Sequence, residues 1–102
     1  MFDLDDIETI EDEAEALENE IRSLQRAING HAWGMEGSYG RAMMQAIEAG
    51  YCILGTTDTH DAYGNHIPSR TQVKLGSKGG TNYARRMQPE FWAYRSEDWA
   101  GA

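Results

Sequence analysis

The residues best suited to chemistry lie in one polar segment, TTDTHDAYGNH, residues 56–66. It holds two aspartates and two histidines, and a lone cysteine precedes it. The set is Asp58, His60, Asp61, His66 and Cys52. Carboxylates, imidazoles and thiolates are ligands for zinc and other divalent ions. A small metal-dependent enzyme that uses the 58–66 loop is therefore one hypothesis for function.

The spacing of these residues argues against a metal site. The chain has no Cys-x-x-Cys pair and no His-x-x-x-His pair, and the order Asp-x-His-Asp matches no calcium-binding loop. Asp, Asn and Gly also favour turns on conformational grounds, and Tyr63-Gly64-Asn65 is a good turn sequence. We therefore expect an ordinary polar loop here, with no metal ion and no cofactor.

Two other candidate sites are weaker still. Cys52 can act as a nucleophile only if His60 or His66 reaches it as a base, and its place in an apolar run favours a packed residue. The loop GSKGGTN, residues 76–82, suggests phosphate binding, but Lys78 precedes the glycine pair instead of following the order of a phosphate loop. No catalytic residue is predicted, and we expect a protein that is not an enzyme.

The charge of the chain is unevenly distributed. The 102 residues carry a formal net charge of −8, and residues 1–20 hold ten acids and no base. Because phosphate binding depends on clustered Lys and Arg, we expect no direct nucleic-acid contact by the N-terminal half. One cysteine fits a reducing cytosol. The N-terminus resembles no signal peptide and no run reaches membrane-spanning length, so a cytoplasmic protein without a membrane partner is expected.

The acidic N-terminal segment predicts one long amphipathic helix over residues 4–28. Its apolar residues recur at steps of three and four, and from Ile7 onward they fill the a and d positions of a heptad. Asp3 can cap its start, and Asn29-Gly30 can supply a left-handed stop at its end. The helix seam comprises Ile7, Ile10, Leu17, Ile21, Leu24 and Ile28. The acids outside this seam, which we call the acidic face, are Asp6, Glu8, Glu11, Asp12, Glu13, Glu15, Glu18 and Glu20.

Three partners for the seam are considered: residues 31–102 of the same chain, a second copy in a homodimeric zipper, or a different protein with a basic surface. Like charges that flank a homodimer seam cost about a few tenths of a kcal/mol per contact. Burying each Leu or Ile gains about 1.5–3 kcal/mol, so self-association is permitted. The seam broadens at Gln25 and Ala27, and we expect the C-terminal third of the helix to dock on the body.

The remaining chain predicts small, mixed elements. A second helix is expected from a cap at Ser38 to a stop at Gly50. Tyr51–Thr57 reads as a buried strand. Residues 70–76 read as a second strand, with Thr71, Val73 and Leu75 inward and Arg70, Gln72 and Lys74 outward. A polar, hairpin-like connection, 58–68, lies between them.

The C-terminal part is aromatic, and Pro89 can open a short helix there. This helix is expected to carry Phe91, Trp92, Tyr94 and Trp99. The predicted fold class is α+β: a long N-terminal amphipathic, coiled-coil-like helix, a second short helix, a small antiparallel sheet and an aromatic-rich C-terminal segment. The predicted division is an acidic heptad helix, 1–30, and a small α+β body, 31–102.

Basic residues interleaved with tyrosines occur in the second half of the chain. They are Arg70, Lys74, Lys78, Arg85 and Arg86, with Tyr83 and Tyr94 nearby. Such a set can hold single-stranded nucleic acid. We expect these bases instead to neutralise the chain's own acidic helix.

The leading functional hypothesis is a non-enzymatic protein–protein interaction module. Its acidic helix would bind a basic surface on a macromolecular protein partner that itself binds nucleic acid. Small acidic inhibitors from phages and mobile elements, anti-CRISPR proteins among them, offer an analogy of size and charge. The alternatives are a homodimeric coiled-coil assembly protein and the metal-dependent enzyme considered above.

Overall fold

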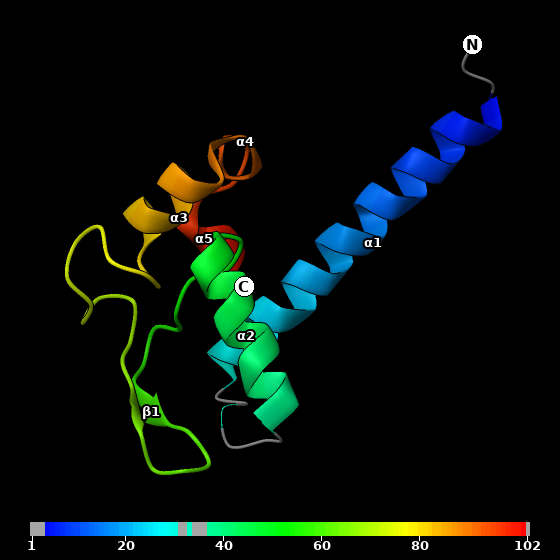
Figure 1. Ribbon diagram of the computed structural model, residues 1–102. Coiled ribbons are helices and arrows are strands. Elements are labelled where there is room, and N and C mark those ends of the chain that lie inside the picture. Colours follow the sequence, from blue (N-terminus) through cyan, green and yellow to red (C-terminus); the bar gives the residue numbers. More distant parts are fainter. Residues whose placement is uncertain (1–3, 31–32, 34–36, 102) are drawn as a thin grey trace.

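The computed structural model describes the backbone of residues 4–30, 33 and 37–101, and the side chains of these except 4–12, 37 and 38. Within this part it places five helices and one two-stranded antiparallel sheet, which confirms the α+β class (Figure 1). The elements are α1 Leu4–Asn29, α2 Gly37–Ala49, β1 Thr59–His60, β2 His66–Ile67, α3 Thr81–Met87, α4 Pro89–Trp92 and α5 Glu97–Gly101.

The predicted N-terminal helix is confirmed as one unbroken element. α1 has 26 residues and is about 39 Å long. It ends at the predicted Asn29-Gly30 stop, where the amide of Gly30 donates to the carbonyl of Arg26 at 2.9 Å, but Gly30 does not adopt the predicted left-handed conformation. Its N-terminal half projects away from the other helices (Figure 1). The radius of gyration is accordingly 15.1 Å, against about 13 Å for a compact chain of this length. The predicted cap Asp3 lies outside the described residues.

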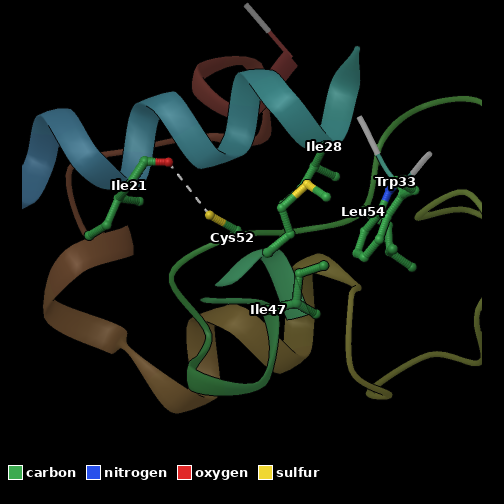
Figure 2. Close-up of a cluster of buried hydrophobic side chains, with 7 residues drawn as sticks. Ile21, Ile28, Trp33, Ile47, Cys52 and Leu54 are labelled. Carbon is green, nitrogen blue, oxygen red and sulfur yellow. Dashed lines mark hydrogen bonds between the residues drawn. The ribbon is translucent and has the colours of Figure 1, made fainter. Parts of the chain in front are cut away.

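The main core forms where the C-terminal third of α1 meets the body, as the broadened seam predicts. Ile21 and Ile28 are buried against Met43 and Ile47 of α2 and against Cys52 (Figure 2). Trp33 and Leu54 complete this cluster. The core therefore draws on both sides of residue 30, and the division of the chain into 1–30 and 31–102 stays a prediction.

The predicted strand Tyr51–Thr57 is wrong, although its burial is correct. Residues 52–55 are buried, yet they pair with no strand of the described chain. Their backbone is bonded instead to a side chain and to loops: the Ile53 amide donates to Gln25 Oε1 at 2.8 Å, and the Leu54 amide donates to the Gly79 carbonyl at 2.9 Å. Buried backbone groups need hydrogen-bond partners, and here a side chain and a loop supply them in place of a neighbouring strand.

The predicted strand over residues 70–76 is also wrong, and its predicted alternation of inward and outward residues fails at Arg70 and Leu75. The segment forms consecutive turns. Leu75, expected inward, is 84% exposed, whereas Arg70, expected outward, has a side chain only 3% exposed. Arg70 is buried because its guanidinium Nε donates to the Leu54 carbonyl at 2.6 Å. The prediction failed because it placed every charged residue in water, whereas a hydrogen-bonded guanidinium can be buried.

The antiparallel sheet lies in the segment predicted as a hairpin-like connection. Thr59 pairs with Ile67 and His60 with His66. Asp61 shapes the intervening turn, because its carboxylate accepts hydrogen bonds from the amides of Tyr63 and Asn65.

The predicted end of the second helix at Gly50 and the predicted start of a C-terminal helix at Pro89 are confirmed. Gly50 ends α2 in a left-handed conformation at φ +87°, and its amide donates to the Ile47 carbonyl. Pro89 opens α4. α2 begins at Gly37, one residue before the predicted cap Ser38, whose side chain lies outside the described residues.

The C-terminal aromatic residues form a second packed cluster. Phe91 meets Tyr51, Trp92 and Trp99 edge-to-face, with ring centroids 5.3–5.5 Å apart. The helix opened by Pro89 ends at Trp92, so it does not carry Tyr94 or Trp99 as predicted. Trp99 belongs to α5, and Tyr94 is 92% exposed and outside the cluster. No helix within the described chain is long and apolar enough to cross a membrane.

Candidate protein-interaction surface

The acidic face is exposed along the described part of the projecting helix. Glu13, Glu15 and Glu20 are all exposed to solvent. The side chains of Asp6, Glu8, Glu11 and Asp12 lie outside the described residues, so their placement stays a prediction. Glu13 and Glu15 therefore face water on the projecting half of α1, whereas Glu20 is exposed closer to the body.

Glu18 differs from these acids because it holds α1 to the C-terminal cluster. Its carboxylate accepts a hydrogen bond from Arg95 Nη2 at 2.5 Å, and Arg22 lies 3.9 Å away. Arg95 also donates to the Phe91 carbonyl at 2.6 Å, and its guanidinium lies 4.0 Å from the centre of the Phe91 ring. The bond and charge of Arg95 hold the pKa of Glu18 below its ordinary value. Glu18 is thus engaged within the chain.

The helix seam changes its environment along α1. Ile21 and Ile28 are buried and Leu24 is half-buried, whereas Leu17 is 50% exposed. The side chains of Ile7 and Ile10 lie outside the described residues. The apolar seam therefore leaves the core between Ile21 and Leu17 and continues, by its sequence, onto the projecting half of α1.

A groove runs between α1 and α2 at this point. Its volume is about 230 Å³, and we call it the α1/α2 groove. It is lined by Leu17, Glu20, Ile21, Leu24, Ala42, Gln45, Ala46 and Tyr51. The α2 side of the groove includes the small side chains of Ala42 and Ala46, and the α1 side includes the exposed residues Leu17 and Glu20.

The base of α1 is fixed by a buried polar network that sequence reasoning missed. Gln25 is 2% exposed, and its amide nitrogen donates to the Ile53 carbonyl at 2.7 Å. Asn29 Oδ1 accepts from Gln25 at 3.1 Å and from Arg70 at 3.4 Å, and Asn29 also donates to the Ala100 carbonyl. The only signal in the sequence was two amides in the broad, otherwise apolar end of the helix. The network fixes the direction in which α1 leaves the body.

The polar loop brings its candidate metal ligands together in pairs, but it does not gather three of them around one point. His66 Nε2 lies 3.1 Å from Asp58 Oδ2, and the rings of His60 and His66 meet at 5.7 Å. The hydrogen bond from His66 lowers the pKa of Asp58. Asp61 instead bonds the backbone and side chain of Asn65. Among the residues with described side chains, no three His, Cys, Asp or Glu side chains are placed to hold one metal ion.

Cys52 is placed as a core residue. Its side chain is fully buried, and burial raises the pKa of the thiol to about 12. The thiol points to the Ile21 carbonyl, with the sulfur 3.6 Å from the oxygen. A thiol that stays protonated at neutral pH is a poor nucleophile.

The expected neutralisation of the acidic helix by five bases is wrong for the described side chains. Arg70 is buried beside Glu97 of α5, and Lys78 lies 3.6 Å from Glu48 of α2. Within the described part of the chain, the base from the body that pairs with an acid of α1 is Arg95, which the predicted set did not include. Among the described side chains, no base of the body pairs with Glu13 or Glu15.

Comparisons with protein-family models, with curated proteins and with solved structures gave no significant match.

Proposed function

We propose that this protein is a non-enzymatic interaction module whose acidic face binds a basic surface of another protein. The observation that carries this proposal is the exposure of Glu13 and Glu15 on the half of α1 that projects from the body, with Glu20 exposed next to it. Carboxylates that are neither paired nor covered attract a Lys- or Arg-rich surface over long range and orient the encounter.

The anchoring of α1 supports the same proposal. Because Gln25, Asn29 and Arg70 fix the base of the helix, the acidic face is presented in one direction before a partner arrives. Binding to a preformed surface loses less conformational freedom than binding by a segment that must first fold.

The partner that suits this surface best is a protein that itself binds nucleic acid. Such proteins cluster Lys and Arg where they contact phosphates, and an acidic helix competes for the same residues. We therefore propose an inhibitory role of the kind found in small phage and mobile-element proteins, acting in the cytoplasm.

Affinity capture from a native lysate tests the proposal. The wild-type chain should retain a partner at low salt and release it as salt rises, because the contacts are exposed charges. The variant Glu13→Gln with Glu15→Gln should lose that partner. The variant Glu90→Gln with Asp98→Asn removes the same charge from exposed positions of the body and should keep it. A partner held equally by both variants would defeat the proposal.

A homodimeric assembly protein is the second candidate, and the 50% exposure of Leu17 on the seam favours it. In that case the acids serve only to keep the outer face of a zipper solvated. Sedimentation at micromolar concentration decides between the two, because a strict monomer excludes the zipper.

A further inference from the structure

The geometry points to the α1/α2 groove as the binding site for an amphipathic α-helix of the partner protein. Apolar side chains of that helix fill the groove, and Lys or Arg residues line its flank next to α1. This inference rests on the proposed function and deepens it, since it names the structural element that the acidic face recognises.

The spacing of the groove residues matches a helix. Leu17 and Leu24 are seven residues apart, two turns or about 10 Å along α1. Ala42 and Ala46 lie one turn apart on α2 and form the opposite wall. A helix that enters such a groove places apolar residues at positions i, i+3 or i+4, and i+7, which cover two turns.

The chemistry of the groove is apolar but incompletely buried. Leu24, Ala42, Ala46 and Tyr51 are each half-buried, and Leu17 is half exposed. The small alanines let a third helix approach α2 closely, as ridges of one helix enter grooves of another. Ile21 at the floor is already part of the core, so the groove has its shape before a ligand binds.

The carboxylates beside the groove favour a partner helix with basic residues along the side that faces α1. Glu13 and Glu20 lie on the same side of α1, seven residues apart, and both are exposed. Glu18, held by Arg95, is not available to a partner. A helix with Lys or Arg along that flank gains two attractions, whereas a second copy of this chain would bring its own carboxylates there.

Three synthetic 18-residue peptides test the inference by fluorescence anisotropy against the full chain. The first carries leucines at a and d positions and lysines at the flanking positions. The second keeps the lysines and replaces leucine by serine, and the third keeps the leucines and replaces lysine by glutamate. We expect the first to bind at least about tenfold more tightly than either other peptide.

Two groove variants locate the binding site. Ala46→Phe fills the groove, and Leu17→Ser removes apolar surface from the projecting helix, where little packing is at stake. Each should weaken the first peptide by about tenfold or more, whereas Ala93→Phe, at an exposed position on the body, should not. Circular dichroism confirms that each variant is folded.

The outcomes separate this inference from the proposed function. If the serine peptide binds as tightly as the leucine peptide, and Glu13→Gln with Glu20→Gln abolishes both, the groove is wrong and the charge recognition stands. If none of the lysine peptides responds to those Gln changes, both proposals fail. A dimer that sediments without peptide and dissociates in Ala46→Phe would identify a second copy as the occupant and overturn the inference.

Discussion

The side-chain amide of Gln25 replaces a neighbouring strand for the backbone of Ile53. Its Oε1 accepts from the Ile53 amide at 2.8 Å, and its Nε2 donates to the Ile53 carbonyl at 2.7 Å. One side chain thus satisfies both backbone groups of a fully buried residue, which a strand would otherwise do. The same pair joins α1 to the segment that carries Cys52 and Leu54.

Replacing Gln25 should therefore destabilise the fold more than its polar character suggests. Gln25→Ala leaves a buried N–H and a buried C=O without partners, so we expect the free energy of unfolding to fall by about 2–5 kcal/mol. Urea unfolding measures the change. Gln45→Ala, at an exposed position on α2, should cost less than about 0.5 kcal/mol. Equal losses would mean that the Gln25–Ile53 pair contributes nothing specific.

The Gln25–Ile53 pair illustrates the difference between features of the fold that local sequence predicts and features that it does not predict. The length of α1, its end at Asn29 and the docking of its last turns follow from periodicity and local stop signals, which act within a few residues. The burial of residues 52–55 follows from their apolar character. Their pairing does not, because an apolar run carries no information on whether a strand or a side chain will bond its backbone.

The candidate site divides in the same way. The exposure of Glu13, Glu15 and Glu20 is predictable, because a narrow seam leaves the other helix positions to water. The engagement of Glu18 depends on Arg95, which lies 77 residues away in the sequence, and no local pattern indicates such a pair. The burial of Arg70 likewise depends on the position of the Leu54 carbonyl.

The Glu18–Arg95 pair should make stability depend on acid pH. Arg95 lowers the pKa of Glu18 in the folded chain from its ordinary value of about 4.5. The stabilisation is therefore fully present above that value and is lost as the pH falls through the lower, folded pKa. We expect Glu18→Gln to be less stable than wild type at pH 7, with the difference shrinking at pH 3.

The matched control for this prediction is Glu15→Gln, which removes a neighbouring exposed acid of the same helix. Its stability difference from wild type should be small at both pH values, because exposed carboxylates contribute little. Thermal unfolding followed by circular dichroism provides the measurement. A wild-type-like pH profile for Glu18→Gln would show that the pair does not form in solution.

Alanine substitutions at two loop glycines should distinguish the cost of backbone strain alone from the cost of strain combined with a steric clash. Gly76 and Gly79 both have positive φ, +84° and +90°. A Cβ added at Gly76 meets nothing within 4 Å, whereas at Gly79 it would lie 2.6 Å from Leu54 Cγ. We expect Gly76→Ala to cost about 1–2 kcal/mol and Gly79→Ala to cost about 1–3 kcal/mol more. Denaturant unfolding should rank the two variants in this order; the reverse order would mean that Leu54 does not pack there.

The Cys52 thiol should be unreactive in the folded protein. With its pKa raised to about 12, the fraction of thiolate at pH 8 is too small for rapid alkylation, and the buried sulfur is also out of reach. Iodoacetamide should label the chain quickly in urea and very slowly in buffer, as followed by intact mass. Rapid labelling of the native chain would show that the segment 52–54 opens readily.

Leu17 and Ile21 are neighbours on one seam but should respond very differently to truncation. Ile21 is 4% exposed in the core, so Ile21→Ala should lower the free energy of unfolding by about 2–5 kcal/mol. Leu17 is 50% exposed, so Leu17→Ala should cost less than about 1 kcal/mol in the isolated chain. Urea unfolding at two protein concentrations tests both. A loss at Leu17 as large as that at Ile21, and growing with protein concentration, would mean that the projecting seam is already packed against a second copy.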